Sequence, residues 1–282
     1  MAVAWRPCSS QACNDNNVKL SAISTGLMDK GFDLGSEKVH PLNAPKIALL
    51  TGEGVSGNSA GEIWHFFDQV LEYPVTLINA TQLGDTRMAD YNVIIMTSGN
   101  YKFLNDKAAL EKLKDWISNG GRLVAMEGGV GQLAKLDWAI KAKKTDDSAD
   151  KKDSYDLLNK YEERERDMLK GSMPGSIYRI ELDNSHPLAY GYPDFYYTLK
   201  QDDNMYEFFK EGGWNVGVMK KEQQVAGYVG SGLRNKLKDG VVFGVQDMGD
   251  GKIVYLADDV LFRSFWENGK LMFCNAVFIV GQ

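Results

Sequence analysis

The chain has 282 residues, of which 44% are hydrophobic and 25% are charged. This composition is ordinary for a globular protein and excludes wholesale disorder, a collagen-like chain and a coiled coil. With 32 Lys and Arg against 38 Asp and Glu, the net charge is −6. Proteins that neutralise nucleic-acid phosphates are usually basic overall or on one face, so no nucleic-acid partner is expected.

Residues 1–44 are polar, rich in Gly, Ser and Asn, and lack sustained periodicity. We predict an extended arm or linker there, followed by one α/β domain over residues 45–282. No apolar run reaches 18 residues, so no membrane span is expected. The first residues lack a charged segment followed by a long apolar one, so they do not form a secretory signal. The protein is then either cytoplasmic or a part of a longer exported chain.

Short apolar runs alternate with amphipathic segments between residues 46 and 140. The helix over residues 59–72 is expected to begin with a capping box formed by Ser59 and Glu62. A second helix follows at residues 105–121, with Asn105 as its cap, and a third begins near Val130. Strands are predicted at residues 46–50, 74–79, 92–99 and 122–129. This alternation predicts a parallel sheet covered on both faces.

The second half of the chain has a different pattern, with a charged segment followed by strand-like runs. Residues 141–170 hold nine basic and nine acidic residues, which predicts a charged insertion over about 141–171. Five strand-like runs then follow with turn signals between them, and Gly249–Gly251 is expected to close a hairpin. These runs predict an antiparallel C-terminal portion of the sheet, before a buried C-terminal helix. The runs are residues 177–183, 214–220, 225–230, 240–247 and 252–258.

The loop from Gly52 to Gly57 reads G-x-G-x-x-G after a strand and before a helix, where a dinucleotide fingerprint would stand. Three features oppose that function. The helix is expected to start only at Ser59, Glu53 places a negative charge where a pyrophosphate would approach, and the next strand ends without an acidic residue. We therefore interpret the loop as a turn at the carboxyl end of a strand, which is where parallel sheets bind ligands.

The turn after the fourth predicted strand holds Glu127 and glycines. In several hydrolase folds such a turn carries the nucleophile, but residues 122–144 contain no Ser, Thr or Cys. Acyl-enzyme chemistry has no starting atom there. Cys274 lies in an apolar run and is interpreted as a buried hydrophobe. The three histidines, His40, His65 and His186, are scattered and do not indicate a zinc site.

Three segments carry a family resemblance: GFDLGS at residues 31–36, GEIWHFFDQ at 61–69, and the FRSFW and NAVF motifs that begin at 262 and 275. Over roughly residues 25–282 the chain resembles the C-terminal region of certain bacterial exported zinc carboxypeptidases of the carboxypeptidase A-like superfamily. In those proteins a class I glutamine amidotransferase-like domain follows the peptidase domain. The resemblance implies a flavodoxin-like, three-layer sandwich with a mainly parallel sheet.

The resemblance does not imply amidotransferase activity. That family uses a Cys at the elbow and a His-x-Glu pair after a late strand. Here the elbow reads Glu127-Gly128-Gly129 and the late strand reads Phe243 to Met248, so both triad positions are vacant. The zinc ligands of the peptidase would lie in the preceding domain.

We therefore expect a non-catalytic accessory or interaction domain of a zinc carboxypeptidase, periplasmic or extracellular within an exported parent, or alternatively cytoplasmic. Its partner would be the peptidase domain or a protein or peptide ligand, and no cofactor, metal or catalytic residue is expected. Glu53 and Glu127 are expected to form a carboxylate pair suited to a cation or amine. The alternatives are a stand-alone hydrolytic enzyme with Glu127 as general base, and a small-molecule-binding or nucleotide-binding protein. The candidate ligand-binding residues are Gly52, Glu53, Gly54, Ser98, Tyr101, Glu127, Gly128, His186 and Arg263.

Overall fold

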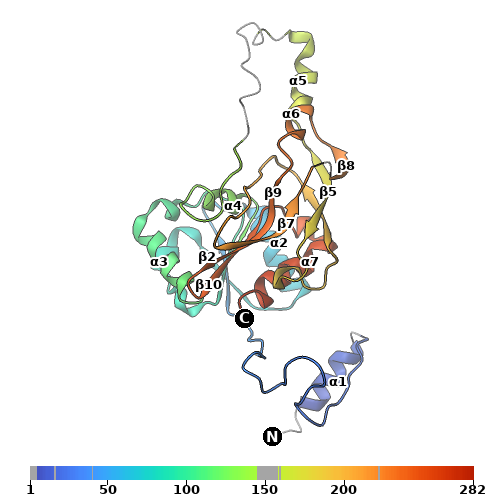
Figure 1. The fold of residues 1–282 in the computed structure, drawn as a ribbon. Helices are drawn as coiled ribbons and strands as arrows, with labels where there is room; N and C mark the ends of the chain where they lie inside the picture. Colours follow the sequence, from blue (N-terminus) through green and yellow to red (C-terminus); the bar gives the residue numbers. More distant parts are fainter. Residues whose placement is uncertain (1–4, 16, 40, 145–157, 159, 222) are drawn as a thin grey trace. The chain divides into compact units, whose positions relative to one another are not determined.

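The computed structural model describes residues 5–15, 17–39, 41–144, 158, 160–221 and 223–282 (Figure 1). Two compact units separate, Met1–Leu42 and Asn43–Gln282, and each is described by itself. The first unit contains a helix, α1 (Trp5–Asp15), where the sequence predicted only an extended arm. Its remaining described residues form turns and bends. Residues 145–157 and 159 of the predicted charged insertion lie outside the described residues.

The second unit is built on a sheet whose first half is parallel. Its strands follow the order β2-β1-β3-β4-β10, and each is parallel to its neighbour. This is the 2-1-3-4-5 order of flavodoxin-like folds, so the predicted α/β class is confirmed. The strands are β1 (Ile47–Thr51), β2 (Val75–Asn79), β3 (Val93–Met96), β4 (Arg122–Met126) and β10 (Gly251–Leu256).

The predicted antiparallel portion continues the same sheet. From β10 the order runs β9-β7-β5-β6, and β8 also pairs with β5. These strands are β5 (Gly175–Leu182), β6 (Phe195–Lys200), β7 (Gly213–Met219), β8 (Gln224–Tyr228) and β9 (Gly240–Met248). Strand β6 was not predicted from the sequence. Its inward-facing side chains include Thr198 and Lys200, so polarity does not alternate with burial as it does in an ordinary strand.

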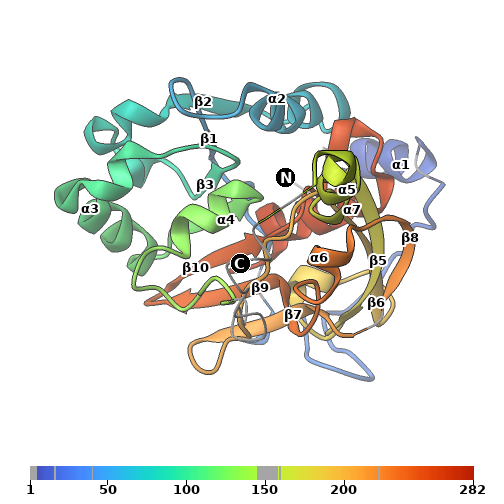
Figure 2. The same ribbon diagram turned by 90° about the horizontal axis from the view of Figure 1, so that it is seen from above.

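Helices cover both faces of the sheet, as expected for the parallel half. Along β1, Ile47 and Leu49 face one core while Ala48 and Leu50 face the other. Helices α2 (Gly57–His65) and α7 (Glu267–Cys274) cover the first face, each continued by a π-helical turn. Helices α3 (Lys107–Ser118) and α4 (Gly128–Leu133) cover the second (Figure 2).

The shorter helices lie at the margins of the sheet. Helices α5 (Arg164–Lys170) and α6 (Ser231–Arg234) lie together beyond the ends of β5 and β8 (Figure 1). No helix among the described residues is long and apolar enough to cross a bilayer. The 3₁₀ turns are Ala80–Asp85, Met88–Asp90, Lys102–Asn105, Tyr161–Glu163, Pro187–Ala189 and Phe262–Ser264.

Two predicted helix starts are wrong. The cap of α2 is Ser56, whose hydroxyl accepts the backbone N–H of Ser59, so Ser59 and Glu62 do not form a capping box. Both residues belong to the helix itself, so their side chains are available for other contacts. The cap of α3 is Asp106, which accepts the N–H of Ala108, and not Asn105. In both cases two capping residues lie close together in the sequence, and local pattern does not choose between them.

Candidate functional site

Three segments meet at the carboxyl edge of the parallel strands. Helix α2 follows β1, a sharp turn follows β4, and a loop follows β10. Strands β4 and β10 are neighbours and end in register, with Met126 opposite Leu256. The N–H of Glu127 donates to the carbonyl of Leu256 at 2.8 Å, which holds the β4 turn against the β10 loop. This edge is where ligands bind in open α/β sheets.

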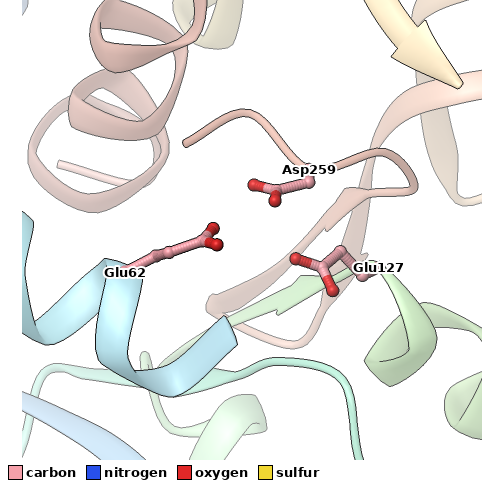
Figure 3. Close-up of side chains that lie close together, drawn as sticks. All are labelled: Glu62, Glu127 and Asp259. Atoms are coloured by element: carbon pink, nitrogen blue, oxygen red, sulfur yellow. The ribbon is translucent and has the colours of Figure 1, made fainter. Parts of the chain in front are cut away.

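Three carboxylates converge at this edge. Glu62 comes from α2, Glu127 from the β4 turn and Asp259 from the β10 loop, and their side chains point toward one another (Figure 3). One oxygen atom from each lies within 4.8 Å of the other two. All three side chains are half-buried, so they are partly withdrawn from water but remain reachable. We call Glu62, Glu127 and Asp259 the acidic cluster.

The backbone of the β4 turn directs Glu127 into the cluster. Its φ of 47° and ψ of −126° lie in a region that non-glycine residues rarely adopt. Helix α4 then starts directly against β3. A Cβ at Gly129 would come within 2.7 Å of the Met96 carbonyl oxygen and 2.8 Å of that of Thr97, so only glycine fits. The turn therefore has the strained form of a nucleophile elbow, with a carboxylate in place of the nucleophile.

Two hydroxyl groups hold the Glu127 side chain. Ser98 donates to its Oε2 atom at 2.6 Å, and Ser59 donates to the same atom at 3.0 Å. Ser98 is itself held by the N–H of Gly128, at 3.1 Å. In the part of the chain that the structure describes, no hydrogen bond reaches Oε1 of Glu127. That oxygen is therefore available to a ligand.

The acidic cluster raises the pKa of each of its members. Burial raises the pKa of Glu127, and the Asp259 carboxylate adds to the rise, while the Ser98 and Ser59 hydroxyls oppose it. Burial and the neighbouring Glu62 raise the pKa of Asp259 to about 7. Burial also raises the pKa of Glu62, against hydrogen bonds from Asp259 and from the N–H of Arg263. At neutral pH part of the cluster is therefore protonated, and a positive ligand would favour its ionised form.

Asp258, next to Asp259 in the chain, is neutralised by a lysine. Lys200 Nζ lies 2.9 Å from Asp258 and 3.3 Å from Asp202, and Thr198 donates to Asp258 at 2.5 Å. Burial alone would lower the pKa of Lys200, but the two carboxylates raise it above its ordinary value. The lysine is thus committed to this pair, and its charge does not neutralise the acidic cluster.

Four of the candidate residues from the sequence lie at or beside the acidic cluster. Glu127, Ser98 and Gly128 form the hydrogen-bonded turn described above. Arg263 has a left-handed φ of 48° and gives its backbone N–H to Glu62.

The other five candidates have different surroundings. Glu53 is exposed and pairs with Lys102 at 2.8 Å, so the carboxylates beside Glu127 are Glu62 and Asp259 and not Glu53. Gly52 lines a separate hollow of about 280 Å³ together with Trp64 and Leu77. Tyr101 is buried and donates to the Thr97 carbonyl oxygen.

Gly54 and His186 complete the set. Gly54 has a φ of 88°, and its carbonyl oxygen accepts the N–H of Asn100, which ties the β1 loop to the β3 loop. His186 lines a different cavity together with Lys252. Lys252 is the second residue of β10, whereas the acidic cluster lies beyond the last residue of that strand.

Glu62, Asp259 and Ser59 are site residues that the sequence pattern did not predict. The predicted capping box gave Glu62 and Ser59 a purely structural role, so neither indicated a binding site. Asp259 directly follows the last predicted strand, and a carboxylate at the end of a parallel strand is a usable signal. The sequence does not show that Asp259 lies near Glu127, because only the register of β10 against β4 brings that strand end to Glu127.

Among the described residues, neither Cys274 nor Ser264 has the surroundings of an activated nucleophile. Burial in α7 raises the pKa of the Cys274 thiol to about 11, which leaves it protonated at neutral pH. Ser264 Oγ lies 3.3 Å from His65 Nδ1. Within the described ranges no carboxylate is hydrogen-bonded to the other ring nitrogen of His65, so this pair lacks the third group of a catalytic triad.

Comparisons with known proteins find the fold only among solved structures. No family model and no curated protein matches the chain. The structure is similar to a ThuA-like protein from Bacteroides uniformis ATCC 8492, with 13% identity, coverage of 86% of this chain and 94% of that one, and a TM-score of 0.48. It is similar to a glutamine amidotransferase from Thermotoga maritima, with 9% identity, 82% and 97% coverage, and a TM-score of 0.48.

A third similar structure is a ThuA-like protein from Parabacteroides merdae ATCC 43184. It shares 11% identity over 83% of this chain and 89% of that one, with a TM-score of 0.47. At these identities the likeness concerns the fold alone. The class of protein is defined by the strand order and the site of this chain, which make it an α/β protein of flavodoxin-like topology with an acidic cluster at the elbow.

Proposed function

We propose that this chain is an amidotransferase-like domain that binds a positively charged ligand at the acidic cluster and performs no acyl transfer. The observation that carries this proposal is the position of Glu127. It occupies the strained turn after β4, with Glu62 and Asp259 within 4.8 Å. Among the described residues, no lysine or arginine side chain forms an ion pair with any of the three. The ligand is a hard divalent cation or the ammonium group of an amine.

Carboxylate and hydroxyl oxygens support this choice of ligand. Hard cations such as Ca²⁺ and Mg²⁺ take oxygen ligands, mostly from Asp and Glu. The cluster supplies three carboxylates from three different segments, and Ser59 and Ser98 orient one of them. An ammonium group would use the same oxygens as hydrogen-bond acceptors. Either ligand would displace the protons that the cluster otherwise holds near neutral pH.

Calorimetric titration tests this proposal. CaCl₂, MgCl₂, MnCl₂ and putrescine are titrated separately into the protein at pH 7, each in two buffers with different enthalpies of ionisation. Binding is expected with proton release, seen as a buffer-dependent heat. Glu127→Gln should abolish binding, whereas Glu53→Gln, a matched exposed carboxylate on the neighbouring loop, should leave it unchanged. No heat with any of the four ligands, or equal binding to both variants, would contradict the proposal.

We propose further that the domain is an accessory or interaction module of a zinc carboxypeptidase-like protein that is exported from the cell. The support is the sequence resemblance over residues 25–282 together with the vacant nucleophile position. An immunoblot of cell fractions with an antibody to this domain tests it. A band far above 31.4 kDa in the exported fraction is expected, and a cytoplasmic band at 31.4 kDa would contradict it.

A second candidate function is hydrolysis with Glu127 as general base. The raised pKa of Glu127 and the pKa of about 7 for Asp259 favour it, because acid–base catalysis works best with groups that titrate near the working pH. Turnover of peptide, ester or amide substrates that rises through pH 7 and disappears in Glu127→Gln would support this function. Binding of a cation without turnover would leave the first proposal standing alone.

A further inference from the structure

A cavity lies toward the opposite end of the strands from the acidic cluster. It has a volume of about 360 Å³, at the lower end of the range of roughly 300–1,000 Å³ seen for small-molecule sites. Its lining includes an aromatic ring, two carboxylates, an imidazole and an amine. These belong to Trp214, Asp183, Asp247, His186 and Lys252.

The sheet register places the main polar groups and the aromatic ring on one face. Trp214 on β7 lies opposite Val245 on β9, and Asp247 lies opposite Lys252 on β10. Val245 and Asp247 are two residues apart in one strand, so their side chains leave the same face of the sheet. Trp214 is 55% exposed, which is unusual for so large an apolar side chain on a strand. The cavity therefore has an indole at its margin and charged groups along one wall.

His186 contributes a hydrogen-bond donor of defined position. Its Nδ1 atom accepts the N–H of Leu188 at 3.1 Å, so in the neutral ring the proton is on Nε2. Burial lowers the pKa of His186 below its usual value, against the charges of Asp183 and Asp247, so the ring is neutral at pH 7. No partner for Nε2 is found among the residues that the structure describes. The ring centre lies 6.3 Å from that of Trp214.

Acceptors and donors are arranged side by side in this wall. Ser185 holds one oxygen of Asp183 through its N–H and its hydroxyl, which leaves the other oxygen to accept. Lys252 Nζ lies 2.6 Å from one oxygen of Asp247, and this pair presents both a donor and an acceptor. A hydroxyl group both donates and accepts, so neighbouring hydroxyls on one ligand match such a wall.

We propose that this cavity binds a neutral saccharide unit, with one C–H face of the sugar ring against Trp214 and its hydroxyls on His186, Asp183 and Asp247. The charges favour a neutral ligand. Two carboxylates disfavour an anion, and the Lys252 amine, paired with Asp247, reduces the attraction for an organic cation. The site shares no residue with the acidic cluster, so the inference is independent of the function proposed above.

Saturation-transfer NMR and calorimetry with defined sugars test this inference. The probes are glucose, galactose, mannose, xylose, N-acetylglucosamine and the disaccharides maltose and cellobiose. At least one sugar is expected to bind, and Trp214→Ala should weaken it by about tenfold or more through loss of the aromatic contact. Trp64→Ala is the matched control, because Trp64 is 46% exposed and lines a different hollow, and it should bind normally.

A second variant separates recognition from folding. His186→Asn keeps an acceptor that can cap the Leu188 N–H but removes the Nε2–H donor, so it should fold and still bind sugar more weakly. Glu127→Gln should bind sugar as the unmodified protein does, which distinguishes this site from the acidic cluster. The inference is overturned if no sugar binds, if Trp214→Ala binds sugar unchanged, or if arginine or choline competes better than any sugar.

Discussion

Asp258 and Asp259 are neighbours in the chain with opposite electrostatic surroundings. Asp258 is fully buried, and Lys200 and Thr198 satisfy its oxygens. Asp259 is half-buried, and the carboxylates of Glu62 and Glu127 each have an oxygen within 4.8 Å of one of its own. Lys200 and Thr198 therefore offset the cost of burying the first aspartate, although burial still raises its pKa, whereas the second is costly as an ion until a positive ligand arrives. A one-residue step along the loop separates a structural carboxylate from a binding carboxylate.

Replacing Lys200 should have the largest effect on stability. Lys200→Met leaves the Asp258 carboxylate buried with Thr198 as its remaining hydrogen-bond partner. Loss of one partner of a buried ion pair costs about 3–5 kcal/mol. Denaturant unfolding should show this loss in the free energy of unfolding. Adding Asp258→Leu to Lys200→Met should recover part of the lost free energy of unfolding. A loss below about 1 kcal/mol in Lys200→Met alone would show that Asp258 does not depend on the lysine.

The same substitution at Asp258 and Asp259 should act in opposite directions. The folded-state pKa of Asp259 is about 7, above its ordinary value of 3.8. Well below pH 3.8 the group is protonated in both the folded and the unfolded state. As pH rises from 4 to 7 the unfolded chain loses this proton first, so the free energy of unfolding falls, and it levels off above 7. The shift of about three pKa units corresponds to about 4 kcal/mol, which partial exposure to solvent screens, so Asp259→Asn should stabilise the protein at pH 8 by the order of 2 kcal/mol.

Thermal melts at pH 5 and pH 8 in the presence of EDTA measure this difference. Asp259→Asn should flatten the fall in melting temperature between the two pH values. Asp258→Asn should lower the melting temperature at both, because it leaves Lys200 with the half-exposed Asp202 as its charged partner. Equal behaviour of the two variants would remove the distinction between the neighbouring aspartates.

Removing the Ser98 hydroxyl should have a smaller effect. Ser98→Ala deletes the 2.6 Å hydrogen bond to Glu127 and the acceptor of the Gly128 N–H. A hydrogen bond to a charged group contributes about 1.5–3 kcal/mol, and part of that is retained here through Ser59. We expect a loss of about 1 kcal/mol in stability at pH 8 and a further rise in the pKa of Glu127. Titration followed by carboxyl-carbon NMR measures the second effect, and an unchanged pKa would contradict it.

The exposed pair of Glu53 and Lys102 should contribute least. Both side chains are well exposed, so water and salt screen their attraction. Glu53→Gln should leave both the free energy of unfolding and cation binding essentially unchanged. A large loss of cation binding in this variant would instead place Glu53 at the acidic cluster.

Local pattern predicted most of the sheet. The strands at residues 46–50, 74–79, 92–99 and 122–129 are present as β1 to β4, since continuous apolar runs leave buried strands few alternatives. Pattern failed at β6, because Thr198 and Lys200 are buried there through contacts with Asp258, some 60 residues away. A buried lysine looks like a surface residue until its partner is known.

By itself the sequence determined the α/β class, the elbow with Glu127 in place of a nucleophile, and the glycines that allow that turn. Apolar periodicity and residue type carry this information because they act over a few neighbouring positions. Only the tertiary structure brought Glu62 and Asp259 to Glu127 and gathered Trp214, His186 and Lys252 around one cavity. Those groupings depend on strand order and register, which join residues up to about 200 positions apart and leave no local trace.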